Sequence, residues 1–250
     1  MNTIDMKGTQ QSTDALAGRG LLQSPEEWEA RNTTLVHTIC DLIETYKPAN
    51  AQAALDVGAE LGGLTDRFAV LTDMTWRAID PDISEHAVSD QGVELFPSFG
   101  HDMPFEDQSF DCVTFINVFE HVSPEWRVPT MKEIKRVLRP GGILVGQLPN
   151  PYFPIESHSR LPLFGYVPTK LQPLYWRLTP TGWDFKKAHF FIVTINHMRR
   201  IAEELGFEIV LVQNFNYPVS AIPKAVRGLA ALHSRLGVLP WAWQFVFRNP

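Results

Sequence analysis

The chain has few cysteines and no long apolar run. Only Cys40 and Cys112 occur among its 250 residues, which excludes a disulfide framework and a cysteine-based metal cluster. No stretch of about 18 apolar residues is present, as a transmembrane helix would need. The first 20 residues also lack the basic start and apolar middle of a signal peptide. We therefore expect a cytoplasmic protein with no transmembrane segment and no metal site.

Positive charge is also scarce, with 22 Lys and Arg against 28 Asp and Glu and a net charge of −6. Because duplex recognition relies on a basic surface, this balance argues against nucleic acid as a partner. The charge is unevenly distributed along the chain. Residues 1–140 carry 23 acidic and 11 basic side chains, whereas residues 141–250 carry 5 and 11. The two parts of the chain therefore suit chemically different partners.

The sequence does contain short apolar runs that alternate with helical patterns. This alternation predicts an α/β fold, a parallel sheet with helices on both faces. Strands are predicted at residues 53–57, 75–80, 110–118, 142–148, 207–213 and 242–247, and helices at 24–46, 126–138 and 194–205. The run from Arg139 to Gly142 is expected to stop the second of these helices. We expect residues 1–23 to form a flexible tail and residues 24–250 to form one domain.

Two segments interrupt this pattern. Residues 149–193 hold seven of the 19 prolines and ten aromatic residues, which is too long a connection for a bare loop and predicts a lid over a site. The aromatics are expected either to enclose an acceptor or to form the lid's own small core. Residues 214–240 form a second insertion. Within it, residues 221–236 read as a basic amphipathic helix that covers the sheet edge or contacts a membrane surface.

A glycine-bearing turn follows the first predicted strand. Gly58 and Gly62 allow a ligand close to the backbone, and the amides at the start of the next helix suit an anionic group. The spacing fits neither the dinucleotide fingerprint nor a P-loop. Asp80 ends the second strand, where a carboxylate can accept hydrogen bonds from a ribose diol.

These features resemble the class I S-adenosylmethionine-dependent methyltransferases, of the methyltransferase type 11-like kind, from about residue 53 to residue 247. The matching segments are residues 56–62, Asp80, 101–111, 110–122 and 136–142. The resemblance implies a Rossmann-like sheet of seven mostly parallel strands whose last strand is antiparallel. It also implies an enzyme that uses S-adenosyl-L-methionine and releases S-adenosylhomocysteine. The acidic first part of the chain suits this cofactor, which has two cationic centres.

The resemblance assigns the cofactor contacts to the turns that follow the strands. They are Asp56, Gly58, Ala59, Glu60, Gly62, Asp80, Pro81, Asp102, Met103, Asn117, Val118 and His121. Glu60 departs from the family pattern, because it stands where a glycine is usual. We expect its side chain to cap the methionine end of the cofactor and to pair with the ammonium group. A catalytically silent scaffold or regulatory partner is the alternative that Glu60 leaves open.

Methyl transfer is an in-line displacement at an activated carbon, so the protein aligns the acceptor and, for a hydroxyl, removes its proton. His158 lies between Glu156 and Arg160 in the lid and is the expected general base, with His121 as the second candidate. Tyr152, Glu156, His158 and Arg160 are expected to contact the acceptor.

The acceptor is expected to be a small molecule. No Asn-Pro-Pro-Tyr run occurs, which favours a hydroxyl of a sugar, glycolipid or natural product over an amine. Carbon or nitrogen acceptors, or a macromolecule, are the alternatives. The basic second part favours an acceptor that is anionic, glycosylated or lipid-linked, and the chain is expected to be a monomer or homodimer.

Overall fold

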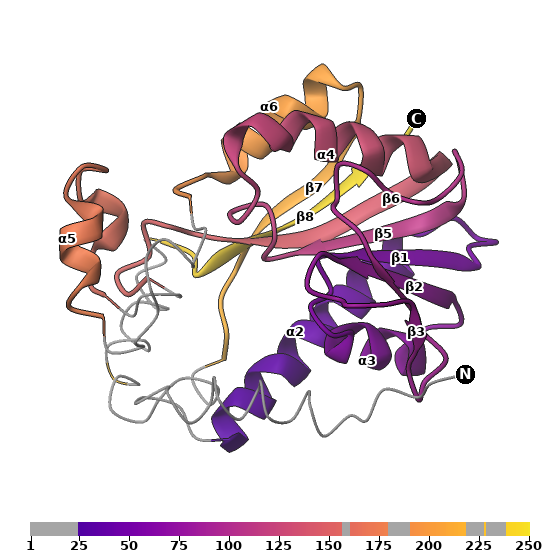
Figure 1. The fold of residues 1–250 in the computed structure, drawn as a ribbon, viewed down its shortest axis with the longest axis horizontal. Coiled ribbons are helices and arrows are strands. Elements are labelled where there is room, and N and C mark those ends of the chain that lie inside the picture. Colours follow the sequence, from indigo (N-terminus) through magenta and orange to yellow (C-terminus); the bar gives the residue numbers. More distant parts are fainter. Residues whose placement is uncertain (1–24, 157–160, 180–190, 219–227, 229–238) are drawn as a thin grey trace.

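The computed structural model describes residues 25–156, 161–179, 191–218, 228 and 239–250. They form an eight-stranded sheet in the order β3-β4-β2-β1-β5-β6-β8-β7, with helices on both faces (Figure 1). This arrangement confirms the predicted α/β, Rossmann-like fold. The expected tail and the expected helix at 221–236 lie outside these residues, apart from Gly228.

The central strands run parallel. They are β4 (Glu94–Pro97), β2 (Thr75–Asp80), β1 (Ala53–Val57), β5 (Phe110–Ile116) and β6 (Leu138–Pro149). The last strand, β8 (Ala242–Arg248), lies between β6 and β7 (Glu208–Phe215) and is antiparallel to both, as predicted. The eighth strand is β3 (Ala87–Val88), an antiparallel edge strand of two residues. A strand of this length shows no periodicity, so the prediction of seven strands missed it.

Four predicted strands have wrong boundaries. β7 is Glu208–Phe215 rather than residues 207–213, and β8 extends to Arg248 rather than ending at residue 247. β5 ends at Ile116 rather than at residue 118, because Asn117 has a φ of 56° and turns the chain. β6 begins directly after the preceding helix, and the segment expected to be a turn is a bulge within the strand. Gly141, at a φ of 79°, donates its N–H to the Asn249 carbonyl at 2.7 Å. The glycines therefore shape the strand, while the helix ends on its own at Val137.

Helices cover both faces of the sheet, α2 (Pro25–Tyr46) and α3 (Gly63–Leu71) on one, α4 (Pro124–Val137) and α6 (Ile195–Glu204) on the other (Figure 1). Successive strand residues point to opposite faces. Ala54 therefore packs in the core under α2 and α3, and Leu55 in the core under α4 and α6. Because both faces are buried, the central strands β1, β5 and β6 are rich in apolar residues. No helix of the described segments combines the length and apolar composition needed to cross a bilayer.

The described part of the lid is a small unit beside the sheet (Figure 1). It contains a β-bridge between Ile155 and Pro162, the 3₁₀ turn η1 (Phe164–Tyr166) and helix α5 (Gln172–Trp176). Leu161, Phe164 and Trp176 are buried together, with Tyr175 packed against them. Part of the lid's aromatic content thus forms a core of its own. Because β6 ends at Pro149, just before the lid, the carboxyl edge of the parallel strands is the edge from which the lid emerges.

Candidate functional site

The turn after β1 is held in a left-handed conformation at three positions. The φ angles are 81° at Gly58, 52° at Glu60 and 84° at Gly62. The N–H groups of Gly58 and Ala59 both donate to the carbonyl of Ile79, at 2.9 and 3.1 Å. The turn is therefore tied to the end of β2. Glutamate at a position with a φ of 52° is strained, since L residues disfavour this region.

Asp80 lies at the same edge, with 8% of its surface exposed. Its Oδ2 accepts the Glu60 N–H and its Oδ1 accepts the Asp82 N–H, both at 2.8 Å. Each carboxylate oxygen can accept more than one hydrogen bond, so both retain acceptor capacity for an external donor. Burial raises the pKa of Asp80, although the two N–H donors oppose this shift. This geometry is compatible with the expected diol, and Pro81 is exposed beside Asp80.

The Glu60 side chain is exposed to water, while protein atoms around its carboxyl group desolvate it in part. Partial desolvation there raises the pKa of Glu60, and the nearby Asp80 and Asp82 raise it further. Three carboxyl groups therefore converge at the ends of β1 and β2. A cationic group such as an ammonium would be stabilised here, because it would relieve the repulsion among them.

Asp56 was expected to contact the cofactor, but its carboxylate lies beneath the turn. It is 4% exposed, and its two oxygens accept hydrogen bonds from the hydroxyls of Thr65 at 2.6 Å and Thr114 at 2.7 Å. These bonds join β1 to α3 and to β5. The structure therefore gives Asp56 a positioning role, in which it fixes the turn that carries Gly58 and Glu60.

Two glycines allow close packing around the turn. A Cβ on Gly58 would lie 2.4 Å from Cγ2 of Val118, and a Cβ on Gly62 would lie 2.9 Å from Cδ2 of Leu95. Gly58 thus brings the turn after β1 directly against the turn after β5. The four residues Gly58, Gly62, Val118 and Leu95 couple three strand ends into one unit.

The loop after β4 carries the residues predicted to hold the adenine. The side chain of Asp102 is exposed at this edge. Met103 is buried, and its N–H donates to Oε2 of Glu133 on α4 at 3.1 Å. Asp102 is accordingly open to a ligand, while the Met103 amide is engaged by the protein.

Asp102 is flanked by a stack of aromatic rings, which the sequence analysis did not predict. The His101 ring lies between Phe99, with centroids 5.3 Å apart, and Trp126, at 4.0 Å. Phe99 and Trp126 are both exposed. Trp126 comes from the start of α4, so only the fold brings the three rings together.

The turn after β5 contains the second candidate base. Asn117 donates its N–H to the Gln147 carbonyl at 2.8 Å, and its Oδ1 accepts from Nε2 of Gln147 at 3.1 Å. These bonds fix the turn to β6. His121 follows, half-buried, with its N–H donated to the Val118 carbonyl at 2.8 Å.

The predicted acceptor residues are placed only in part. His158 and Arg160 lie outside the described residues. Tyr152 is half-buried, with its ring centroid 5.2 Å from that of Tyr166. Glu156 is buried, and its N–H donates to the Leu161 carbonyl at 3.0 Å. The two described residues thus lie at the base of the lid, next to the end of β6.

Arg31 of α2 lies in an aromatic cluster that the sequence analysis missed. Its guanidinium lies over the rings of Tyr217 at 4.7 Å, Trp241 at 5.2 Å and Trp28 at 5.9 Å. The Tyr217 hydroxyl is 3.4 Å from Nε2 of Gln147, the same amide that bonds Asn117. Within the described part of the chain, no carboxylate pairs with Arg31. The spacing of Trp28 and Arg31 on one helix is the one local signal of this cluster.

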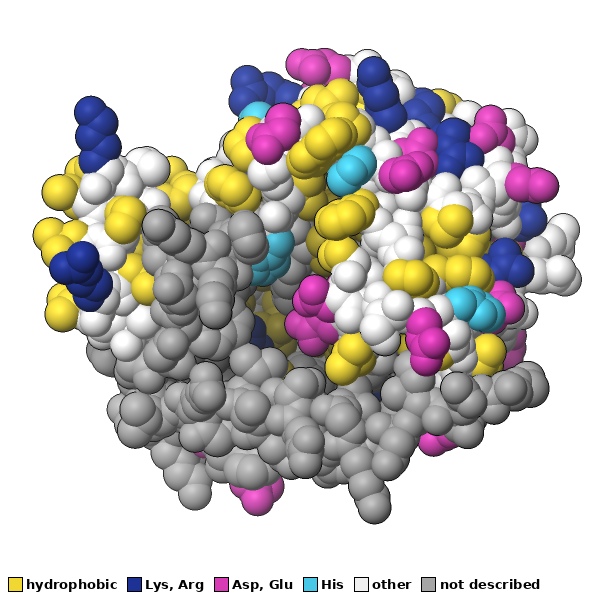
Figure 2. Space-filling model, in the orientation of Figure 1, with side chains coloured by type: hydrophobic (Ala, Val, Ile, Leu, Met, Phe, Trp, Pro, Cys, Tyr) yellow, Lys and Arg dark blue, Asp and Glu magenta, His cyan; other side chains and the backbone are white. Residues whose placement is uncertain are grey.

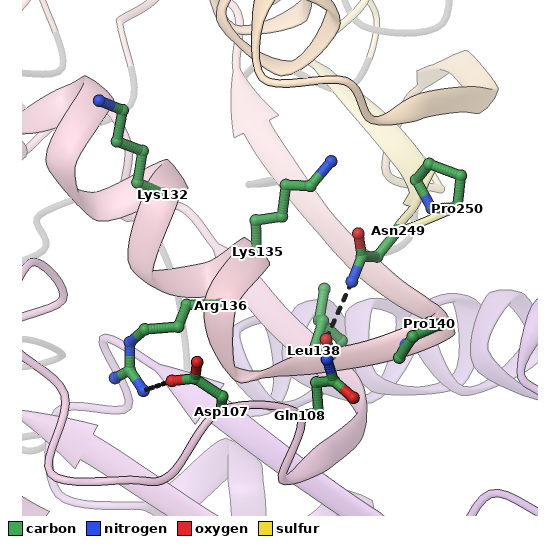
Figure 3. A pocket seen from close by; sticks show the side chains of 9 residues that line it. All are labelled: Asp107, Gln108, Lys132, Lys135, Arg136, Leu138, Pro140, Asn249 and Pro250. Carbon is green, nitrogen blue, oxygen red and sulfur yellow. Dashed lines mark hydrogen bonds and ion pairs between the residues drawn. The ribbon is translucent and has the colours of Figure 1, made fainter.

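Figure 2 shows the molecule hollowed between the α5 segment and the sheet, with acidic and histidine side chains on the walls of the hollow. A different cavity, of about 430 Å³, lies at the opposite edge of the sheet, where β6 starts and β8 ends (Figure 3). Two of its three cations are engaged by the protein. Lys135 donates to the Leu205 and Gly206 carbonyls, and Arg136 pairs with Asp107 and Glu133. This second cavity is remote from the strand ends that carry the candidate site.

Comparisons with known proteins agree with this geometry. Residues 55–146 match the family model described as a methyltransferase domain. The demethylmenaquinone methyltransferase of Staphylococcus aureus (strain JH9) is 29% identical over 185 residues, which cover 68% of this chain and 73% of the relative.

Solved structures show the same fold. A SAM-dependent methyltransferase from Archaeoglobus fulgidus has a TM-score of 0.56 at 15% identity, over 89% of this chain and 96% of the other. An S-adenosylmethionine-dependent methyltransferase from Mesorhizobium loti has a TM-score of 0.56 at 14% identity, over 83% and 96% of the two chains.

Proposed function

The chain is a class I S-adenosylmethionine-dependent methyltransferase, and from this premise we propose that it methylates a hydroxyl group of a small-molecule acceptor. The observation that carries the proposal is the contact of Gly58 with Val118. It sets the turn that faces the cofactor directly beside the turn that carries His121. A cofactor and an acceptor bound at these two turns would lie next to each other.

The residues at the strand ends fit the chemical groups of the cofactor. Asp80 would accept hydrogen bonds from the ribose hydroxyls through its remaining lone pairs, and Asp102 would hold the adenine amino group. The carboxylate of Glu60 would pair with the ammonium group. Asp56 fixes the turn from beneath. When bound, S-adenosylmethionine supplies a methyl carbon activated by a sulfonium.

The protein's own task is then to align the acceptor and remove one proton. His158 of the lid is the proposed base, and His121 is the second candidate. A neutral imidazole nitrogen accepts the hydroxyl proton as the oxygen attacks. Tyr152, Glu156 and Arg160 orient the acceptor around it.

Arg31 supports an acceptor that carries an anionic group. The aromatic rings shield the faces of its guanidinium, so its N–H edge is the part left for a ligand. The acid-rich end of the site lies at Glu60, Asp80 and Asp82, whereas Arg31 is linked through Tyr217 and Gln147 to Asn117. The cationic end of the cofactor would thus bind near the three carboxyl groups, and an anionic group of the acceptor would bind near Arg31. The acceptor named in the Staphylococcus relative, demethylmenaquinone, is also a small molecule rather than a macromolecule.

The proposal is tested by labelling. Cell extract incubated with the protein and isotopically labelled S-adenosylmethionine should yield a labelled small molecule whose new methyl group is on oxygen, as identified by mass spectrometry and NMR. His158→Ala should then lower turnover at least tenfold while S-adenosylhomocysteine affinity stays within about twofold, as expected for loss of a general base. A label on carbon, on nitrogen or on a macromolecule would contradict the proposal. Unchanged turnover in His158→Ala, with loss in His121→Ala, would assign the base to His121 instead.

A further inference from the structure

The described part of the lid exposes an unusual amount of apolar surface. Leu163, Tyr166, Leu171, Leu174 and Leu178 are between 52% and 69% exposed. These five residues, together with Lys170 and Arg177, are called the lid face below. Few large apolar side chains elsewhere in the described residues are as exposed, and none of those gather within so short a segment.

The lid face is the outer side of a folded unit. Its inner side is already used, because Leu161, Phe164 and Trp176 are buried together. On α5, Gln172 and Trp176 are buried while Leu174 is exposed, and Leu178, just after the helix, is exposed as well. A surface helix normally presents polar residues outward and apolar ones inward. Here both sides carry apolar side chains, so those on the outer side are left exposed to water.

The charges of the lid face indicate what kind of partner would bind it. Lys170 and Arg177 are both exposed, and the segment from residue 161 to residue 179 contains no Asp or Glu. Figure 2 shows hydrophobic side chains interspersed with basic ones over the α5 segment. Leucines flanked by cations, with no acidic residue among them, are the pattern of a segment that lies in the headgroup region of an anionic bilayer.

We propose that the lid face docks on the surface of a bilayer that contains anionic phospholipid. The leucines and Tyr166 enter the boundary between headgroups and acyl chains, and Lys170 and Arg177 pair with lipid phosphates. This inference goes beyond the proposed function, because it does not depend on the identity of the acceptor. It places the lid, and with it the mouth of the site, at a membrane surface.

A second copy of the chain fits the lid face less well than a membrane. Symmetric pairing of two lid faces would bring Lys170 and Arg177 of one copy close to the same cations of the other, with no acidic residue in residues 161–179 to offset them. An anionic bilayer, in contrast, attracts both cations of a single copy.

The test is sedimentation of the full chain with vesicles. Vesicles of phosphatidylglycerol and phosphatidylcholine should bind the protein at least tenfold more tightly than vesicles of phosphatidylcholine alone, and high salt should weaken the binding. The variant Leu171→Ser/Leu174→Ser/Leu178→Ser and the variant Lys170→Glu/Arg177→Glu should each lower the affinity at least tenfold.

Matched controls lie outside the lid face. Val70 and Lys132 are also exposed, so Val70→Ser/Lys132→Glu should bind vesicles like the wild type. All variants should keep S-adenosylhomocysteine affinity, which shows that they are folded and separates this proposal from the proposed function. The inference would be overturned if the wild-type protein did not bind anionic vesicles, or if the leucine variant bound them like the wild type. A concentration-dependent dimer in size-exclusion chromatography that the leucine variant loses would also overturn it, in favour of a second copy.

Discussion

The backbone N–H of Glu60 donates a 2.8 Å hydrogen bond to Oδ2 of Asp80. This bond joins the turn after β1 to the end of β2, so the two segments proposed to hold the methionine end and the ribose of the cofactor are one structural unit. Because the backbone N–H makes this bond, a glutamate at position 60 keeps it where the family usually has glycine. The left-handed φ of 52° strains the glutamate, which a glycine would avoid.

Asp80 is predicted to be required for cofactor binding. Asp80→Ala should abolish S-adenosylhomocysteine binding in calorimetry, because both acceptor oxygens are lost. Asp80→Asn should weaken binding about tenfold or more, since its amide retains a single acceptor oxygen. Asp73→Asn is the matched control, because Asp73 is an exposed carboxylate just before the start of β2, at the other end of the strand from Asp80. Asp80→Asn that binds within twofold of wild type would contradict the assignment.

The contact of Gly58 with Val118 gives a prediction about stability. Gly58 and Gly92 share a φ of 81°, but a Cβ on Gly92 would meet no atom within 4 Å, whereas one on Gly58 would meet Val118 at 2.4 Å. Gly92→Ala should lose about 1 kcal/mol of unfolding free energy from its backbone conformation. Gly58→Ala should lose about 1–3 kcal/mol more from overpacking.

Denaturant unfolding measures both losses. The double variant Gly58→Ala/Val118→Ala should recover part of the additional loss, because it removes the two methyl groups that a Cβ on Gly58 would meet. Equal unfolding free energies for Gly58→Ala and Gly92→Ala would show that the turn after β1 does not depend on this contact.

The residues of β1 and β2 were predicted correctly because apolar runs bounded by turn residues leave little choice of boundary. The bulge in β6 was not, since its Arg-Pro-Gly-Gly run reads locally as a helix stop. The partner that keeps the chain extended there is Asn249, more than 100 residues further along the chain.

The candidate site shows the same limit. The turn residues Gly58 and Gly62 and the strand-end Asp80 carry local signals, and the sequence located them at one edge of the sheet. The Thr114 hydroxyl that bonds Asp56, and the rings of Tyr217 and Trp241 around Arg31, come from distant segments, so no local pattern predicts them. Sequence therefore identified which residues belong at the edge better than it identified what each side chain touches.

Two aspartates on neighbouring strands should respond to pH with opposite signs. Burial raises the pKa of Asp56, against the opposing effect of its threonine hydroxyls. Burial alone would also raise the pKa of Asp111, but Arg139 at 2.7 Å and the N–H groups of Gln52 and Ala53 lower it overall. For Asp56, stability is full below the unfolded pKa of about 4 and is lost as the pH rises toward its folded pKa. For Asp111, stability is full above that value and is lost as the pH falls.

Urea unfolding between pH 3 and pH 7.5 distinguishes the two cases. Relative to wild type, Asp56→Asn should gain unfolding free energy as the pH rises above about 4. Asp111→Asn should be less stable than wild type near neutral pH, and this difference should shrink as the pH falls below about 4. Parallel pH profiles for wild type and both variants would rule out these two carboxyl groups as sources of pH dependence.

Arg31 is predicted to recognise an anionic group of the acceptor. With the acceptor found by labelling, Arg31→Met should raise KM about 10- to 100-fold, the effect expected for loss of charge-assisted hydrogen bonds. The value of kcat and the affinity for S-adenosylhomocysteine should change little, because Arg31 lies on the acceptor side. The KM of Arg31→Lys should lie between those of the wild type and Arg31→Met, since lysine keeps the charge without the planar donor fork.

Arg67→Met is the control for this experiment, because Arg67 pairs with Glu29 at 2.8 Å on the surface and has no role in the proposed site. Inorganic pyrophosphate should inhibit the wild type competitively with the acceptor and should inhibit Arg31→Met much less. A variant with unchanged KM but reduced kcat and lower thermal stability would show that Arg31 only packs Tyr217 and Trp241 together. An uncharged acceptor would then become the better hypothesis.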